Sequence, residues 1–204
     1  IDRAVWDARE TNPAAIDADL IRDSAILYLE GYLFDKPQAQ EAFFQSVKIA
    51  RQAGRQIALT LSDPFCVNRH KDAFRGLIRS GIDIVFANQQ ELMALTDTHD
   101  IAEAIAAVRD ECTLLVATMS ENGAFICAKN RDPIHIKAEP VKKLVDTTGA
   151  GDQYAAGFLY GLTHGHDLPT CGKLGALAAA EIISHVGARP ETPLAKLAAA
   201  KGLA

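Results

Sequence analysis

Residues 24–64, "SAILYLEGYLFDKPQAQEAFFQSVKIARQAGRQIALTLSDP", contain a complete strand–helix–strand unit. The apolar run 24–31 predicts a buried strand, residues 38–53 have a helical period that ends before Gly54, and residues 55–64 predict the next strand. Two strands joined by a helix in this way lie parallel in a sheet, with helices covering its faces. The unit therefore predicts an α/β fold.

The same alternation continues along the chain. Later segments predict helices over 70–80, 89–95 and 101–109, strands over 81–88 and 113–120, an antiparallel edge pair over 123–130 and 132–139, and helices over 150–165 and 174–190. Gly187 and Pro190 are expected to end the last helix. No linker, low-complexity tract or repeat interrupts the pattern, so residues 1–204 are expected to form a single α/β domain with a mostly parallel central sheet.

The composition limits the classes of function. The chain has 204 residues, of which 49% are hydrophobic and 23% charged, enough for one substantial core. Its formal net charge of -5 argues against a broad surface for nucleic acid or for anionic membrane. Any phosphate chemistry must therefore be local.

The cysteines and the apolar runs predict a cytoplasmic location. Cys66, Cys112, Cys127 and Cys171 are widely separated, form no C-x-x-C pair and are expected to be reduced and buried. No apolar run reaches the roughly 18 residues that span a bilayer, and residues 1–10 are too charged for a signal peptide.

Polar clusters follow three of the predicted strands. Residues 88–91 follow "DIVFA", residues 118–123 follow "LLVA", and residues 146–152 follow "VKKLV", which is interpreted as a strand. Ligands of open parallel sheets bind beyond the carboxyl ends of the strands. The three clusters are therefore expected to lie around one crevice.

The segment 145–158, "VDTTGAGDQYAAGF", places Asp152 after Gly149-Ala150-Gly151 at the start of a predicted helix. Small residues allow close backbone approach, and the free N–H groups of a helix start suit an anion. Asp152 could accept a proton from an attacking hydroxyl beside those N–H groups. The alternative is an ordinary capping Asp, which favours the same position.

The other two polar clusters can each be interpreted in two ways, as a ligand-binding site or as a structural feature. Asn88 and Glu91, spaced i, i+3, could hold a hydrated Mg²⁺ and a phosphate oxygen, or form a capping box. Thr118 and Ser120 with Gly123 suit phosphates or a ribose, or form a hairpin turn. The small residues of 174–190 could leave a slot for a planar base, or pack closely against another helix.

These motifs, "DTTGAGD", "NQQE", "TMSENG" and "AAAEIISHVGARP", resemble in order and spacing the PfkB, or ribokinase-like, family of small-molecule kinases. The resemblance runs from about residue 20 onward and implies a three-layer α/β/α sandwich. It implies that Asp152 is the catalytic base and that Gly149, Ala150 and Gly151 form an anion hole for the γ-phosphoryl group. It further assigns Mg²⁺ and phosphate contacts to Asn88 and Glu91, and ATP contacts to Thr118, Ser120, Gly123 and Ala176.

Within the family, "LEGYLFD", "LSDPF" and "FANQQE" are most similar to the bacterial adenosine kinase branch. The resemblance implies ATP and Mg²⁺ as cofactors, with a monovalent cation such as K⁺ as a further candidate. It implies a nucleoside or sugar as substrate, no nucleic acid or membrane partner, and a monomer or homodimer. Family members are about half again as long, so an N-terminal portion with the lid is expected to be missing from this sequence.

Three functions remain open at this point. The first is phosphate transfer from ATP to the 5′-hydroxyl of adenosine, which yields AMP. The second is a ribokinase- or fructokinase-like sugar kinase. The third is a catalytically inert nucleotide-binding relative, which would have no need of a base at Asp152.

Overall fold

The structure, a computed structural model, describes residues 12–203, so the predicted absence of a signal peptide in residues 1–10 lies outside the described residues. The chain divides into two compact units. Unit 1 extends to Leu115 and includes Ala128–Asn130, and unit 2 consists of Val116–Cys127 and the residues from Arg131 onward. Each unit is described by itself.

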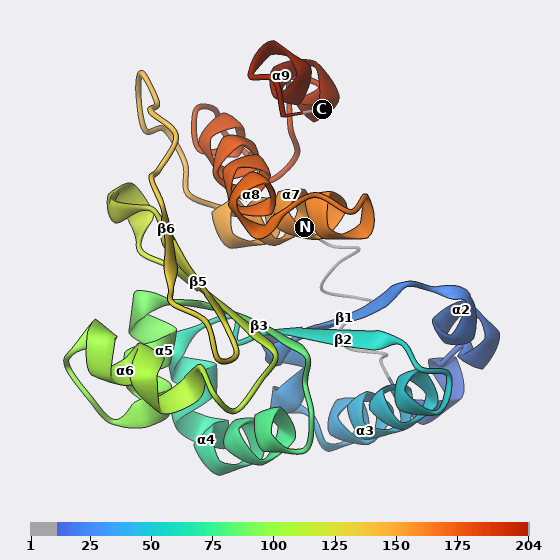
Figure 1. Ribbon diagram of the computed structural model, residues 1–204. Coiled ribbons are helices and arrows are strands. Elements are labelled where there is room, and N and C mark those ends of the chain that lie inside the picture. The colour runs from blue at the N-terminus through green and yellow to red at the C-terminus, as the bar shows by residue number, and fades with distance from the viewer. Residues whose placement is uncertain (1–11, 204) are drawn as a thin grey trace. The chain divides into compact units, whose positions relative to one another are not determined.

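Unit 1 contains three parallel strands and the helices that connect them (Figure 1). Ala58 is the register partner of Tyr28 on one side and of Ile84 on the other. The strands are β1 (Ile26–Glu30), β2 (Gln56–Thr60) and β3 (Ile84–Asn88). The helices are α2 (Ala18–Asp23), α3 (Pro37–Gln52), α4 (Pro64–Arg79), α5 (Gln89–Thr96) and α6 (Ile101–Val108), with 3₁₀ turns η1 (Pro13–Ala15) and η2 (Gly31–Asp35).

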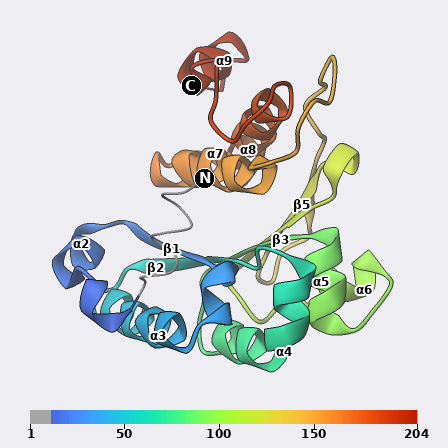
Figure 2. The ribbon, with the colours of Figure 1, turned by 180° about the vertical axis from the view of Figure 1, so that it is seen from behind.

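Helices α3 and α4 lie on the same side of β1 and β2, as the two opposite views show (Figures 1 and 2). Phe34 of η2 is fully buried, and its ring centroid lies 5.0 Å from that of Phe43 in α3 and 4.7 Å from that of Phe74 in α4. Such aromatic contacts bury a large apolar area. The ring of Phe34 therefore anchors η2, which directly follows β1, to both helices.

Unit 2 contains the end of β4 (Leu114–Thr118), a hairpin and, among its described residues, three helices, of which the first two pack closely together. The hairpin consists of β5 (Ala124–Ala128) and β6 (Ile134–Ile136) and follows the 3₁₀ turn η3 (Ser120–Asn122). The helices are α7 (Ala150–Thr163), α8 (Leu168–Ile182) and α9 (Leu194–Ala200). Helix α8 packs on the hairpin, where a Cβ on Gly172 would lie 2.6 Å from both Ile126 and Ile136.

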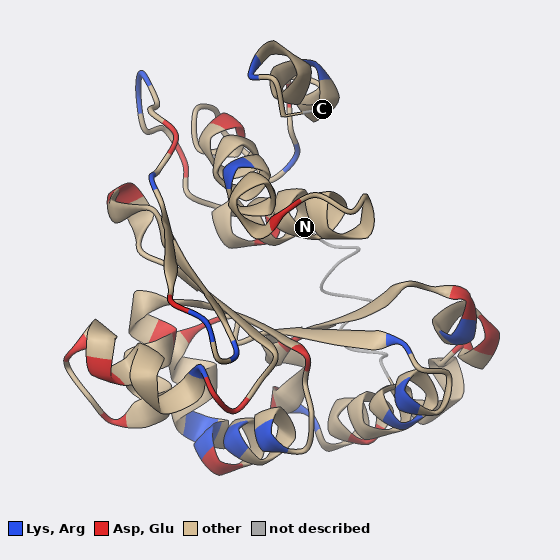
Figure 3. Ribbon diagram, in the orientation of Figure 1, with Lys and Arg blue, Asp and Glu red and all other residues tan. Residues whose placement is uncertain are grey.

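The hydrogen-bonded order of the strands is β1-β2-β3-β4-β5-β6, and the antiparallel pairing of β5 with β6 confirms the predicted edge pair. Figure 3 shows that Lys, Arg, Asp and Glu lie mostly on helices and connections rather than on strands, which is typical of strands buried on both faces. The expected α/β fold with a mostly parallel sheet is confirmed.

Several element boundaries differ from the prediction. Helix α4 begins at Pro64 because the Asp63 carboxylate accepts hydrogen bonds from the N–H groups of Phe65 and Cys66. The expected strand over 141–145 is wrong, because Val145 donates its N–H to the carbonyl of Ile183, at the end of α8. Helix α8 itself ends at Ile182, before Gly187.

Strand β1 lies at the edge of the described sheet, with β2 as its described neighbour. Its residues Ile26, Leu27 and Tyr28 are half-buried, whereas Ile57, Ala58 and Leu59 of β2 are fully buried. The four cysteines are buried and form no disulfide with one another, as expected. None of the described helices combines the length and the apolar composition that crossing a bilayer requires.

Glycines set the spacing of α7 and α8. A Cβ on Gly157 would lie 2.5 Å from the carbonyl oxygen of Leu174, and a Cβ on Gly175 would lie 2.8 Å from that of Tyr154. A backbone atom cannot move aside as a flexible side chain can. We therefore expect Gly157→Ala to lower the free energy of unfolding by about 1–3 kcal/mol, measured by urea denaturation.

The matched control is Gly76→Ala in α4, where an added Cβ meets no atom within 4 Å. Alanine favours a helix over glycine, so this change should stabilise the protein by up to about 1 kcal/mol. Equal effects of the two substitutions would show that the contact between α7 and α8 is not tight.

Candidate active site

The start of α7 is fixed by Gly149. This residue is the N-cap and has φ 79°, in the left-handed region that glycine adopts without strain. A Cβ at this position would also lie 2.9 Å from the Cβ of Ala188. Only glycine therefore meets both the backbone angle and the close contact that precede α7.

Of the backbone N–H groups of residues 149–151 at the start of α7, one donates a hydrogen bond to a described residue and two do not. Ala150 donates its N–H to the carbonyl of Thr147 at 3.1 Å. Within the described part of the chain, the N–H groups of Gly149 and Gly151 have no protein acceptor. Open donors at the positive end of a helix suit an anion. The predicted anion hole over 149–151 stays a prediction, in which Gly149 and Gly151 offer the open N–H groups.

Asp152 lies in the first turn of α7 with an exposed side chain. Among the described residues, no group donates a hydrogen bond to its carboxylate, so Asp152 forms no hydrogen-bonded cap, although its charge still favours the first turn through the helix dipole. Partial burial by neighbouring atoms raises the pKa of the Asp152 carboxyl above its ordinary value. A carboxylate with a raised pKa is a stronger base than an aspartate with the ordinary pKa.

Asp146 ties the segment before α7 to the loop after α8. Its carboxylate accepts hydrogen bonds from the N–H of Gly187 at 3.0 Å and from the N–H and hydroxyl of Thr148 at 2.9 and 2.7 Å. These bonds, that from Gly187 first, lower the pKa of Asp146 to about 2. Asp146 therefore stays ionised as a structural acceptor and is no candidate for the base.

A second carboxylate, Glu181 of α8, holds the other end of the same loop. One of its oxygens accepts the N–H groups of Glu191 at 3.0 Å and Thr192 at 2.7 Å, and the other lies 3.3 Å from Nε2 of His185. Burial acts to raise the pKa of Glu181, but these hydrogen bonds outweigh it, and the pKa is lowered. The loop in which Ala188 contacts Gly149 is thus held by hydrogen bonds at Gly187 and at residues 191–192.

The predicted ATP-contacting residues Thr118, Ser120, Gly123 and Ala176 all lie in unit 2. The turn interpretation of 118–123 is confirmed: Met119 donates its N–H to Gly123 at 2.7 Å, and a Cβ on Gly123 would lie 2.0 Å from the carbonyl oxygen of Ile136. Ser120 is exposed, whereas Ala176 is buried in α8. Their contacts with ATP stay predictions.

Asn88 and Glu91 form the capping box that the sequence offered as an alternative. Glu91 is buried, and its two oxygens accept the N–H and the side-chain amide of Asn88 at 2.8 and 2.6 Å, while Asn88 Oδ1 accepts the N–H of Glu91 at 2.9 Å. Direct coordination of Mg²⁺ would have to break these bonds. The pair fits an ion that keeps its waters. Both residues lie in unit 1, so the crevice shared with 118–123 and 146–152 stays a prediction.

Comparison with known proteins places the chain in a family. The model of the pfkB family of carbohydrate kinases matches residues 3–195. The chain belongs to this family. Its fold is ribokinase-like, as predicted.

Proteins similar to this pfkB-family chain include nucleoside and sugar kinases. The chain is 30% identical to adenosine kinase of Saccharomyces cerevisiae, over 90% of this chain and 56% of that protein. Among solved structures, adenosine kinase from Sinorhizobium meliloti has a TM-score of 0.91 at 43% identity, over 94% of this chain and 59% of that one. A probable sugar kinase protein from Rhizobium etli has a TM-score of 0.93 at 47% identity, over 96% and 59% of the two chains.

A more distant structure, Arabidopsis thaliana ribokinase complexed with ribose and ATP, has a TM-score of 0.71 at 25% identity and covers 89% of this chain and 58% of that one. The chain thus spans less than two thirds of the length of each of these four proteins.

The sequence analysis missed the structural carboxylates of this pfkB-family chain and two aromatic residues. Glu181 has a signal in hindsight, because it is a lone charge within a run of alanines, "AAAEII", and a buried charge requires partners. Tyr32 and Phe65, which are 55% and 75% exposed, lie in the connections after β1 and β2. Apolar rings directly after the carboxyl ends of strands are a signal that the sequence carries.

The Glu181–His185 pair predicts a pH-dependent stability. Burial would lower the pKa of His185, but the hydrogen bond to Glu181 and the charges of Glu191 and Glu181 outweigh it, and the pKa is raised; Asp146 also faces His185. A raised histidine pKa stabilises the fold fully below the ordinary 6.5 and loses this stabilisation as pH rises through the folded value. We expect the midpoint of thermal unfolding to fall from about pH 6 to about pH 8.5.

In Glu181→Gln this decrease of the unfolding midpoint should become smaller, because the hydrogen-bonded charge of Glu181, the largest cause that raises the pKa of His185, is gone. His164→Gln, a change at the exposed end of α7, should keep the decrease of the parent protein. An unaltered pH profile in Glu181→Gln would contradict the coupling.

Proposed function

We propose that the protein transfers the γ-phosphoryl group of ATP to a hydroxymethyl group of a small molecule, with adenosine as acceptor and AMP as product. The observation that carries this proposal is the Asp152 carboxylate, which has a raised pKa and no described donor, next to the open N–H groups of Gly149 and Gly151. Asp152 takes the proton of the attacking 5′-hydroxyl. The backbone of Gly149, Ala150 and Gly151 stabilises the negative charge of the phosphoryl group in transfer.

ATP and Mg²⁺ are the proposed cofactors. The ATP-bound ribokinase relative supports the nucleotide, and we assign its contacts to Thr118, Ser120, Gly123 and Ala176. The capping box of Asn88 and Glu91 would hold the waters of a hydrated Mg²⁺, which neutralises phosphate charge when bound. We further propose a monovalent cation such as K⁺ as an activator, a monomer or homodimer, and a cytoplasmic location, which the buried cysteines without a disulfide support.

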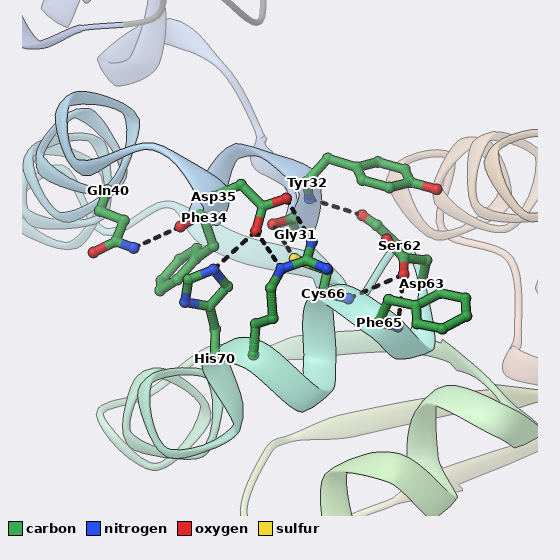
Figure 4. A network of polar contacts seen from close by, with 11 residues as sticks. Gly31, Tyr32, Phe34, Asp35, Gln40, Ser62, Asp63, Phe65, Cys66 and His70 are labelled. Atoms are coloured by element: carbon green, nitrogen blue, oxygen red, sulfur yellow. Dashed lines mark hydrogen bonds and ion pairs between the residues drawn. The ribbon is translucent and has the colours of Figure 1, made fainter.

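Adenosine is favoured over a free sugar by Tyr32 and Phe65. The two rings are exposed and extend to the same side of the contact network in Figure 4, away from the buried Phe34. Exposed aromatic rings at a ligand-binding end of a sheet offer stacking surfaces for a planar base, which a free sugar lacks. The similarity to two adenosine kinases supports the same acceptor.

The second candidate is a ribokinase- or fructokinase-like sugar kinase, which the 47% identity to a probable sugar kinase protein favours. An inert nucleotide-binding relative is disfavoured, because it has no use for an unpaired carboxylate beside the open N–H groups.

We expect Asp152→Asn to lower the rate of phosphate transfer from ATP to adenosine by about 10²- to 10⁴-fold, because the base is lost while the shape is kept. Nucleotide binding through the backbone should persist. The free energy of unfolding should stay equal or rise slightly, because a carboxyl whose pKa folding raises destabilises the fold when it is ionised. The measurement is steady-state transfer by the full-length protein with Mg²⁺, with ribose and fructose as alternative acceptors.

The control is Asp167→Asn, since Asp167 is the N-cap of α8 and accepts the N–H of Thr170 at 2.9 Å. This substitution should leave the transfer rate near that of the parent. If Asp152→Asn is as active as Asp167→Asn, then Asp152 is structural and the proposed mechanism is wrong. A protein that binds ATP but transfers phosphate to none of these acceptors would be the inert relative.

Phe65→Ala tests the choice of acceptor. Loss of one stacking surface should raise the KM for adenosine about tenfold and leave the KM for ribose unchanged. Phe44→Ala is the matched control, because Phe44 is a 52% exposed phenylalanine on α3. A parent protein that prefers ribose or fructose to adenosine would establish the sugar kinase instead.

A further inference from the structure

An ion pair joins the connections that carry Tyr32 and Phe65. The guanidinium of Arg69 in α4 donates to both oxygens of Asp35 at the end of η2, at 3.0 and 2.6 Å, and His70 Nε2 lies 2.9 Å from the first of these oxygens (Figure 4). A bidentate pair of this kind fixes orientation as well as distance. The pair therefore fixes how the first turns of α4 lie against η2.

Each partner of this ion pair is close along its element to one of the exposed rings. Arg69 follows Phe65 by one helical turn, so the two side chains share a face of α4. Asp35 lies in the same short 3₁₀ turn as Tyr32. A rotation of α4 that separated Arg69 from Asp35 would also move Phe65 relative to Tyr32.

Other links between the two connections include the packing of Phe34 on Phe74 and a set of contacts near the strand ends. A Cβ on Gly31 would lie 2.7 Å from the carbonyl oxygen of Leu61, Tyr32 donates its N–H to Ser62 Oγ at 3.3 Å, and the Cys66 thiol donates to the carbonyl of Gly31 at 3.3 Å. Ser62 has φ 69°, which is unfavourable for a residue with a side chain. These contacts hold the residues that directly follow β1 and β2. The ion pair joins residues that come later in the same two connections.

The same cluster has donors of a metal site, since one ligand atom each of Asp35, Cys66 and His70 lies within 4.8 Å of the others. Arg69, however, already occupies both Asp35 oxygens with a positive charge. Burial raises the pKa of the Cys66 thiol to about 11, so it stays protonated and neutral. The arrangement suits a positioning role better than a cation site.

We infer that Asp35 and Arg69 are positioning residues that set the spacing of Tyr32 and Phe65, and thereby the selectivity for acceptors with a planar ring. This inference rests on the proposed function, because it assigns the two rings to the acceptor. Exposed ion pairs contribute little to stability, and Arg69 is 52% and Asp35 40% exposed. The pair can therefore be broken without unfolding the protein.

The test is Arg69→Gln in the full-length protein, with Arg79→Gln as matched control. Arg79 lies at the other end of α4, and its exposed guanidinium forms an ion pair with Glu111 at 3.0 Å. Arg69→Gln should raise the KM for adenosine about tenfold, with kcat and the KM for ribose within about twofold of the parent. Arg79→Gln should change none of these constants.

A double-mutant cycle with Phe65→Ala separates positioning from general destabilisation. In the Phe65→Ala background, Arg69→Gln should raise the KM for adenosine by less than about twofold, because the ring through which it acts is gone. An equal effect in both backgrounds, an equal rise of the KM for ribose, or no effect at all would overturn the inference.

Amide hydrogen exchange gives a readout that needs no substrate. Arg69→Gln should speed exchange at residues 31–35 and 62–66 about tenfold, and Arg79→Gln should not. If the parent acts on sugars and on no nucleoside, then adenosine is not the acceptor, and the inferred selectivity for planar rings is wrong. Faster exchange in Arg69→Gln would still show that the ion pair positions the two connections. Unchanged exchange together with intact nucleoside kinetics would leave the proposed function standing and refute the inference alone.

Discussion

The arrangement of unit 2 depends on one close contact, that between Gly149 and Ala188. Gly149 needs both a left-handed backbone and the absence of a side chain, because a Cβ there would lie 2.9 Å from the Cβ of Ala188. The contact brings the start of α7 against the loop after α8. The open N–H groups of Gly149 and Gly151 and the carboxylate of Asp152 all take their places from this approach, so the chemistry proposed for them depends on it.

The acidic groups of this region have opposite environments. Asp146 accepts three hydrogen bonds from Gly187 and Thr148, and its pKa lies near 2. Asp152, in the same segment, has no described donor, and burial raises its pKa. Carboxyls whose pKa values are driven apart in this way serve different purposes, one as a fixed charge and the other as a group that exchanges a proton. The contrast distinguishes the proposed base from its neighbours on physical grounds, independently of any resemblance.

Much of the fold could be predicted from hydrophobic period, because buried parallel strands and amphipathic helices have distinct patterns. The start of α4 could not, because it is set by the Asp63 cap and not by a change of period. Residues 141–145 were expected to be a strand, but the N–H of Val145 pairs with the carbonyl of Ile183 at the end of α8, a contact distant in sequence. The site segment 149–152 and the capping box were readable, since both depend on local spacing. The partners of Glu181 and Asp35 were not readable from the sequence, because they lie outside the elements that contain these two residues.

In unit 1, stability and recognition are assigned to different residues of the same connection. Phe34 is fully buried between Phe43 and Phe74 and anchors η2 through apolar area, whereas Tyr32 and Asp35 of the same turn are at least partly exposed. A ring that contributes to the core cannot move without loss of packing, whereas an exposed ring can change its spacing at little cost in stability. Selectivity for an acceptor can therefore be adjusted at Tyr32, Phe65 and the ion pair behind them, while the Phe34 core that keeps the connection in place stays constant.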